Sequence, residues 1–309
     1  MLLESTCGSI SPVNAISLSD LQRLIQDWAG IPLMDVRLEE DFAVGHIAGA
    51  KNACVFKVSF LDDVAQLGVT KDERIVVYGT MEQSHESRVA AEKLGRAGYS
   101  QVLDFRGGLR EWVEGNGVVE GTRQAPPAEP LNGRFAVNLA ESRIEWTGRN
   151  LLNKHSGTIG LKSGHLMFKE DALVGGDFVL DVNAMTCGDI QDGKTNQVLI
   201  DHLKSDDFWD AANHPEARYQ IREVHPFADA TPGSANMRIN GDFTLRGCMN
   251  PLGFLAVLGR TAGGRPAAQA VFAFDRTLWG SIYGSGKFFA SLGMHLVNDL
   301  VEVQVRLVA

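Results

Sequence analysis

The hydrophobic pattern of the chain changes once, at about residue 120. Before that point, short apolar runs alternate with segments whose apolar residues recur every three or four positions. From residue 134 onward, apolar and polar residues mostly alternate one by one. The first pattern is typical of buried parallel strands separated by helices, and the second of antiparallel strands with one buried face. We therefore expect a multidomain protein, with an α/β domain over residues 1–120 and an antiparallel β-barrel over residues 133–309.

The first region contains signals for both helices and strands. Ser19 and Gln22 have the spacing of a capping box, so a helix is predicted to begin at Ser19. Residues 86–97 have a second helical pattern, which ends at Gly98, a residue suited to the backbone conformation just after a helix. The further predicted elements are strands at 32–36, 75–78 and 101–105 and a short helix at 109–114.

The second region consists almost entirely of strand signals. Apolar residues at every second position predict strands at 237–245, 270–274 and 301–307. The other predicted strands are 142–149, 157–169, 176–185 and 217–226, with one helical insertion at 197–210. About eight strands with one insertion predict a closed barrel, whose interior is either packed or holds one small ligand.

A proline-rich segment separates the two regions. Gly121–Pro130 contains three prolines in ten residues, a composition that favours a stiff, extended chain, and we predict a linker at 121–132. Residues 1–120 carry 18 acidic and 11 basic residues, so most of the net charge of −9 belongs to the first domain.

Composition excludes several classes of protein. With a net charge of −9, the chain lacks the basic face that nucleic-acid binding or docking on anionic lipid requires. The four cysteines, Cys7, Cys54, Cys187 and Cys248, form no CxxC pair, so neither a disulfide framework nor a structural zinc site is expected. No apolar run is long enough for stable membrane insertion, and the N-terminus lacks the pattern of a signal peptide, so we expect a cytoplasmic location.

Several separated motifs in residues 16–118 resemble the rhodanese-like family. They are Asp35-Val36-Arg37, Glu40, Gly45–Asn52, Gly98-Tyr99 and Gly107–Trp112. The resemblance implies a parallel α/β fold in which Asp35 and Arg37 form a buried structural pair and His46 has a structural role.

The loop at 79–86 departs from that family. Active rhodaneses place a cysteine directly after the strand that corresponds to 75–78, in a loop whose backbone amides surround the sulfur. Here that residue is Gly79, and the loop contains neither cysteine nor arginine. Glu82 and Glu86 add negative charge where an anionic sulfur donor would bind, so the module is predicted to be catalytically inactive.

Two other groups of residues are candidates for a catalytic role in the first domain. Ser84, His85 and Glu86 are adjacent, but catalytic triads are usually assembled from distant segments, and Cys54 belongs to another loop and is expected to be a small buried hydrophobe. A sulfurtransferase or phosphate-transfer enzyme that uses the 79–86 loop is the alternative function.

Residues 134–309 resemble the YceI-like family. The matching segments are 144–148, 155–159, 162–166, 176–181, 202–209, 214–215, 241–247, 274–276 and 283–286. The resemblance implies a lipocalin-like barrel associated with binding of polyisoprenoids or other long-chain lipids. Burial of an apolar chain contributes roughly 0.8 kcal/mol per CH₂ group, so a long chain would offset the cost of its immobilisation.

Seven aromatic residues are candidates for lining such a ligand site, with core packing as the alternative role for each. They are Trp146, Phe178, Phe208, Trp209, Phe243, Phe272 and Phe274. Phe208 and Trp209 lie on the helical insertion and are predicted to cover one mouth of the barrel.

No cofactor or metal is expected. Polar residues gather around the insertion, namely Asp201, His202, Asp206, Asp207 and His214, but they match no metal-binding signature. Asp275 and Arg276 are interpreted as a buried pair that stabilises the barrel. The partners left open are a homodimer and a basic protein that docks on the acidic first domain.

Overall fold

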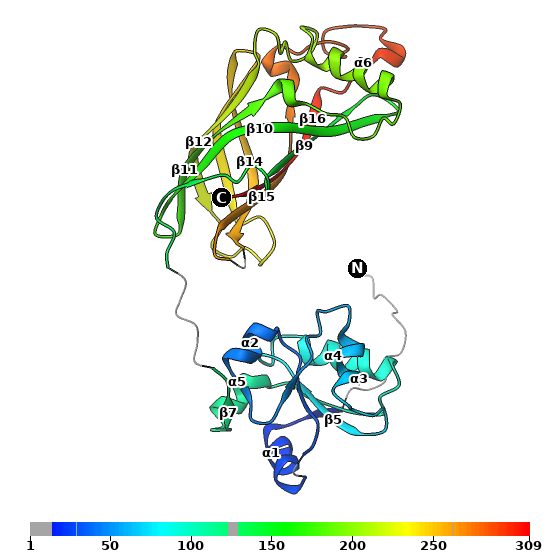
Figure 1. Cartoon of the computed structure of the whole chain (residues 1–309), viewed down its shortest axis with the longest axis vertical. Coiled ribbons are helices and arrows are strands. Elements are labelled where there is room, and N and C mark those ends of the chain that lie inside the picture. The colour runs from blue at the N-terminus through cyan, green and yellow to red at the C-terminus, as the bar shows by residue number, and fades with distance from the viewer. Residues whose placement is uncertain (1–13, 29, 123–128, 262) are drawn as a thin grey trace, which may run out of the picture. The chain divides into compact units, whose positions relative to one another are not determined.

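The computed structural model describes residues 14–28, 30–122, 129–261 and 263–309. The chain divides into two compact units, Met1–Pro127 and Ala128–Ala309 (Figure 1). Cys7 and residues 123–128 of the predicted linker lie outside the described residues.

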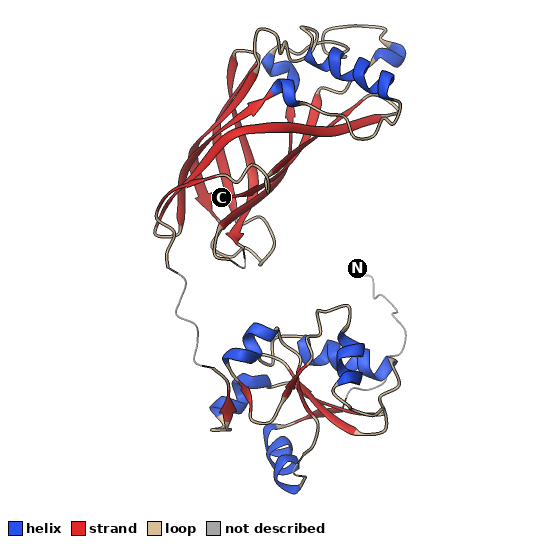
Figure 2. Ribbon diagram, viewed as in Figure 1, coloured by secondary structure: helices blue, strands red, loops and turns tan. Residues whose placement is uncertain are grey.

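The N-terminal unit is built on a parallel sheet, as the sequence predicts (Figure 2). Its strands in the described residues are β1 (Asn14–Ile16), β2 (Leu33–Asp35), β4 (Lys51–Asn52), β5 (Arg74–Tyr78) and β6 (Gln101–Phe105). They are ordered β1-β6-β5-β2-β4, and all neighbours run parallel. The strands β3 (His46–Ile47) and β7 (Val119–Glu120) form a separate, short antiparallel sheet.

Helices cover both faces of this sheet. They are α1 (Leu18–Asp27), α2 (Glu39–Val44), α3 (Phe60–Gln66), α4 (Glu86–Arg96) and α5 (Gly108–Glu114). Along β5, Ile75 and Val77 pack into a cluster with residues of α3 and α4, whereas Val76 and Tyr78 pack with residues of α1 and α5. Because successive strand residues point to opposite faces, both faces of the sheet are apolar and buried.

The N-cap of the first helix lies two residues before the predicted cap, Ser19. The N-cap is Ser17, whose hydroxyl accepts a hydrogen bond from the amide of Asp20 at 3.2 Å, and the Asp20 carboxylate accepts one from the amide of Ser17. The prediction of Ser19 was wrong because aspartate performs here the role usually given to glutamate or glutamine in a capping box. Helix α4 ends close to the predicted residue, with Gly98 at φ 93°.

The C-terminal unit is a closed antiparallel barrel, as the sequence predicts. In the described residues its eight strands are β9 (Arg143–Arg149), β10 (Lys154–Lys169), β11 (Ala172–Asp181), β12 (Glu216–Pro226), β13 (Met237–Leu245), β14 (Cys248–Arg260), β15 (Pro266–Asp275) and β16 (Leu300–Val308). Consecutive strands pair from β9 to β16, and β16 closes the barrel on β9. A short strand, β8 (Gly133–Ala136), pairs with the far half of β10.

Helix α6 (Gly193–Lys204) and the segment that precedes β16 lie at the same end of the barrel (Figure 1). The 3-10 helices of this unit are η1 (Val182–Ala184), η2 (Arg276–Trp279) and η3 (Gly293–His295). The predicted strand at 176–185 was therefore too long at its end, because the Asp181 side chain caps η1 through the amide of Asn183.

Strand β14 was missed by the sequence prediction. Its inward residues include Leu252, Phe254 and Leu258, which pack against the core. The outward residues Pro251 and Leu255 are exposed but also nonpolar, so the strand shows no contrast between its two faces. Period-two alternation is invisible where both faces carry nonpolar residues.

Both ends of the predicted linker bind to the units that flank it. The amide of Thr122 donates to the carbonyl of Ala43 at 2.8 Å in the N-terminal unit. The amide of Leu131 donates to the carboxylate of Asp171 at 2.9 Å in the barrel, and Leu131 joins the barrel core.

None of the described helices is both long enough and apolar enough to span a lipid bilayer.

Candidate functional site

In the loop after β5, the side chain of Glu86 folds back toward Gly79 and Thr80. The hydroxyl of Thr80 donates a hydrogen bond to Oε1 of Glu86 at 3.0 Å. A Cβ atom at Gly79 would lie 2.7 Å from Oε2 of the same side chain. The Glu86 carboxylate therefore fills the space into which a side chain at residue 79 would extend.

The surroundings of this carboxylate lower its pKa, although its buried Oε2 atom has no hydrogen-bond partner among the described residues. Partial burial alone would raise the pKa of Glu86, but hydrogen bonds within the loop, including that from the Thr80 hydroxyl, outweigh burial and lower the pKa. The lowered pKa favours a negative charge on this side chain within the loop.

The other polar residues of the loop do not form a catalytic relay. The Ser84 hydroxyl donates to the carbonyl of Met81 at 2.7 Å and accepts from the amide of Met81, which makes a local turn. Glu82 and His85 are exposed. In the described residues, Ser84, His85 and Glu86 therefore lack the nucleophile-to-base contact that catalysis would need.

The remaining motif residues of the N-terminal unit are structural in this geometry. The Arg37 guanidinium lies 2.5 Å from the Asp35 carboxylate, and both side chains are buried. Arg37 also donates to the carbonyl of Gly45 at 2.6 Å, so it ties β2 to the segment before β3. The His46 ring stacks on Phe42, and Cys54 is 3% exposed.

The barrel encloses a cavity of about 420 Å³. Its wall is formed by inward-facing residues of the strands together with side chains of α6, and apolar residues predominate. All seven aromatic residues predicted as ligand contacts line it: Trp146, Phe178, Phe208, Trp209, Phe243, Phe272 and Phe274. A volume of this size is typical of sites for small organic ligands.

Three aromatic wall residues were not predicted. Tyr219 lies in β12, a strand that was predicted, and shares its inward face with Ala217 and Ile221, so periodicity alone could have found it. Phe254 lies on the missed strand β14 and stacks on Phe272 with ring centroids 4.4 Å apart. Tyr283 lies in an irregular segment, and only the tertiary structure brings it to the cavity.

Phe208 and Trp209 lie inside the barrel end and not on an exposed flap. They follow α6 in a turn and are 6% and 7% exposed. Phe208 packs on Tyr283, with ring centroids 5.3 Å apart, and Trp209 approaches Phe274 at 6.5 Å. Both residues form part of the cavity wall and of the core at once.

Arg276 is the one fully buried arginine among the described residues, and its partner is not the predicted one. It donates to the carbonyls of Ser281, at 2.6 Å, and Tyr283, at 2.8 Å, and a carboxylate oxygen of Asp299 lies 3.8 Å away. Asp275 instead binds Lys287 and Thr277. The predicted Asp275–Arg276 pair was wrong because adjacent residues at the end of a strand point in different directions.

The polar residues around α6 do not converge on one point. His202 pairs with Asp207 at 3.1 Å, and His214 lies 3.9 Å from Asp210. Asp201 accepts from Gln197. Asp206 contacts Arg246 through its carbonyl.

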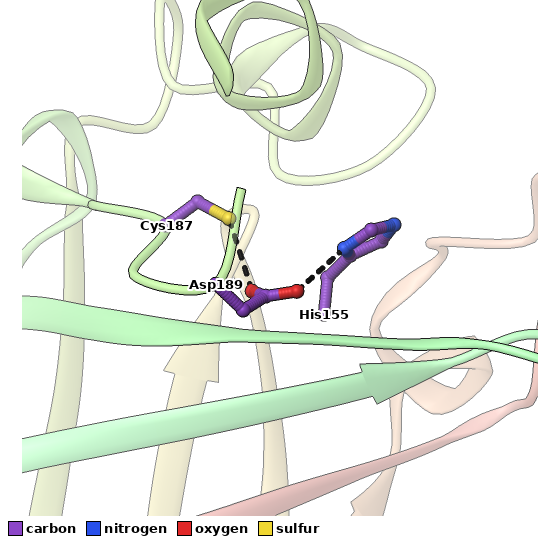
Figure 3. Close-up of side chains that lie close together, drawn as sticks. All are labelled: His155, Cys187 and Asp189. Carbon is purple, nitrogen blue, oxygen red and sulfur yellow. Dashed lines mark hydrogen bonds and ion pairs between the residues drawn. The ribbon is translucent and has the colours of Figure 1, made fainter. Parts of the chain in front are cut away.

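A different cluster is the only group of three or more potential metal ligands found in the described residues. It comprises His155, Cys187 and Asp189, whose ligand atoms all lie within 4.8 Å of one another (Figure 3). The cluster could not be predicted from the sequence, because its members are far apart along the chain. His155 lies near the start of β10, and Cys187 and Asp189 lie in the loop before α6. Cys54, Cys187 and Cys248 are free thiols.

The family models match both units. Residues 135–309 match the model described as a YceI-like domain, and residues 17–115 match the model described as a Rhodanese-like domain. The first match spans more than half of the chain, so the protein belongs to the YceI-like family, and it carries a rhodanese-like domain at its N-terminal side.

Two curated proteins are similar to the N-terminal unit. "Adenylyltransferase and sulfurtransferase UBA4" of Meyerozyma guilliermondii is 30% identical over 115 residues, which are 34% of this chain and 26% of that protein. "Uncharacterized protein YibN" of Escherichia coli K12 is 31% identical over 107 residues, 34% of this chain and 71% of YibN. The chain therefore spans about a quarter of the length of the yeast protein.

One solved structure that resembles the barrel is a polyisoprenoid binding domain from Saccharophagus degradans. It is 12% identical, with a TM-score of 0.42, and the match covers 58% of this chain and 98% of that chain.

Proposed function

We propose that the barrel binds a long-chain apolar ligand, a polyisoprenoid or another lipid, without chemical conversion. The observation that carries this proposal is the apolar cavity of about 420 Å³ inside a closed barrel of the YceI-like family. Each CH₂ group transferred from water into such a wall contributes roughly 0.8 kcal/mol, so chain length sets the affinity.

The distribution of polar groups along the wall supports a defined orientation of the ligand. Arg149, Asn150 and His155 line the cavity where β9 ends and β10 begins, and His202 of α6 joins them. Asn150 pairs with Val297 of the segment before β16, so these groups belong to the end of the barrel that carries α6. A polar headgroup would be bound at that end, with the apolar chain extending between the aromatic rings.

The N-terminal unit is part of the same proposal, as a rhodanese-like module that serves regulation or interaction and not catalysis. What supports this role is the pairing of Gly79 with Glu86, whose carboxylate takes the space of the missing side chain. A sulfurtransferase or phosphate-transfer reaction in the 79–86 loop is the competing function, and no side chain described there supplies an activated nucleophile.

Extraction of the purified full-length protein into organic solvent, followed by mass spectrometry, tests the ligand proposal. We expect a long-chain lipid in stoichiometric amount, or saturable uptake when lipid-free protein is incubated with a polyprenol. A folded protein that neither retains nor takes up any long-chain lipid would contradict the proposal.

A thiosulfate-to-cyanide sulfurtransferase assay tests the inactive module separately. We expect thiocyanate formation at the level of the buffer control, and the same result for Cys54→Ala. Turnover that survives Cys54→Ala would mean that the 79–86 loop itself is catalytic.

A further inference from the structure

A three-residue cluster adjoins the polar end of the barrel cavity, and only one of its members, His155, also lines that cavity. His155 lies near the start of β10, and Cys187 and Asp189 lie in the loop between η1 and α6 (Figure 3). The side chains point toward one another from these two segments. Their ligand atoms are a nitrogen, a sulfur and an oxygen, all within 4.8 Å of one another.

Asp189 is the centre of this cluster. One of its carboxylate oxygens accepts a hydrogen bond from the Cys187 thiol at 3.2 Å and another from the amide of Ser156 at 2.8 Å. The other oxygen lies 3.0 Å from Nδ1 of His155. Although burial opposes ionisation of Asp189, these hydrogen bonds outweigh it and lower its pKa to about 2.

The backbone holds the loop against β10, so the cluster is a formed arrangement. The amide of Gly188 donates to the carbonyl of Ser156 at 2.9 Å, and the amide of Thr186 donates to that of Thr158 at 2.8 Å. The side-chain amide of Asn196, in the first turns of α6, donates to the carbonyl of Cys187 at 2.9 Å. Three independent contacts therefore fix where the sulfur and the carboxylate lie.

The arrangement does not suit a cysteine nucleophile. In a catalytic pair the imidazole contacts the thiol directly, whereas here the carboxylate lies between them.

We propose that His155, Cys187 and Asp189 form a binding site for a divalent cation of the zinc class. Nitrogen, sulfur and oxygen from these residue types are the ligands that zinc prefers. Bonds of about 2.0–2.3 Å place neighbouring ligand atoms of a tetrahedral site about 3.3–3.8 Å apart. The contacts of 3.0 Å and 3.2 Å made by Asp189 are close to that spacing, and the three ligand atoms, all within 4.8 Å of one another, would draw together around the ion.

Charge and proton balance are consistent with such an ion. Binding releases the Cys187 proton to solvent, so a thiolate and a carboxylate together supply two negative charges to a 2+ ion, and neutral His155 donates a lone pair. No atom changes its oxidation state in this step. Three protein ligands leave a fourth coordination place for water.

The ion would join the loop before α6 to the strand β10. Because His155 also lines the lipid cavity, the site lies beside the polar end of that cavity. The proposed role is therefore to stabilise the barrel end that carries α6, beside the polar end of the proposed lipid site.

Titration of the metal-free full-length protein with Co²⁺ tests this inference. Bound Co²⁺ reports a thiolate ligand through a sulfur-to-cobalt charge-transfer band in the near ultraviolet. We expect one equivalent of Co²⁺ with this band, displaced by Zn²⁺, in wild type and in the exposed-cysteine control Cys248→Ala. The band should vanish in Cys187→Ala.

A second pair of variants keeps the test decisive if Cys187→Ala fails to fold. His155→Ala should weaken Co²⁺ binding at least about tenfold. The control His225→Ala, which removes an exposed histidine 3.3 Å from Glu223, should leave binding unchanged. Folded wild-type protein without the charge-transfer band, or a band that persists in Cys187→Ala, overturns the proposal.

Discussion

The candidate sites of the two units differ in how they are filled: a side chain occupies the first, whereas the second retains a cavity. In the N-terminal unit, the Glu86 carboxylate fills the space beside Gly79 at the end of β5. In the barrel, the wall aromatics pack against one another and still leave a cavity of about 420 Å³. Both units retain the motifs of their families, so the comparison shows that motifs report the fold, whereas the atoms inside the site decide what it can bind.

Buried arginines provide the largest test of how each unit is held together. Arg276→Met removes the donors to the carbonyls of Ser281 and Tyr283 and should destabilise the barrel by about 3–5 kcal/mol. Arg37→Met leaves the buried Asp35 carboxylate unpaired and should cost the N-terminal unit a similar amount.

Urea unfolding of the full-length protein, with a probe in each unit, measures both losses. The exposed Arg306 supplies the control Arg306→Met, for which no more than a small change is expected. A loss below about 1 kcal/mol for Arg276→Met would show that the carbonyls find other donors, and the barrel end would then not depend on this side chain.

A cysteine introduced at residue 79 tests whether Glu86 fills this site. Gly79→Cys should destabilise the N-terminal unit by about 1–2 kcal/mol, because the new Cβ would lie 2.7 Å from Oε2 of Glu86. Thiocyanate formation should stay at background, since the adjacent carboxylate raises the thiol pKa and repels thiosulfate. The double variant Gly79→Cys/Glu86→Ala should regain the lost stability. Robust activity of Gly79→Cys alone would contradict the inference that Glu86 blocks the space beside residue 79.

Filling the barrel cavity tests the other side of the comparison. Ala270 lines the cavity, and Ala270→Trp should weaken binding of a fluorescent long-chain fatty acid about tenfold, the equivalent of displacing about two CH₂ groups from the wall. The matched control is Ala273→Trp, on the exposed face of the same strand. Equal affinities in the two folded variants would place the ligand outside the barrel.

The smallest effect is expected for ion pairs on the surface. Arg265 and Glu141 lie 2.7 Å apart, but their side chains are 46% and 43% exposed. Arg265→Ala should therefore change the unfolding free energy by no more than about 1 kcal/mol, and added salt should reduce the difference further. A larger loss in urea unfolding would mean that this pair organises the barrel and is not a solvated contact.

Most of the fold could be predicted from local patterns, and the failures have physical reasons. The apolar run at 75–78 predicted a strand buried on both faces, and the alternation at 237–245 predicted the barrel strand β13. Strand β14 escaped because its outward residues are also nonpolar. The start of α1 was misplaced because Asp20 can close a capping box with Ser17.

The candidate sites were predictable to different degrees. The aromatic wall followed from alternation, because an inward-facing strand residue in a barrel has only the interior to contact. The pairing of Asp275 with Lys287, and not with Arg276, could not follow from sequence, because it depends on how the segment before β16 folds back.

Residue types and local periodicity were enough to predict the two fold classes and the aromatic character of the barrel interior, and they place a glycine at residue 79. The contact of Glu86 with the space beside Gly79, the barrel cavity and the meeting of His155 with Cys187 and Asp189 emerge only in three dimensions. These three outcomes depend on contacts between segments separated along the chain, whose distances are set by packing and not by the order of the residues.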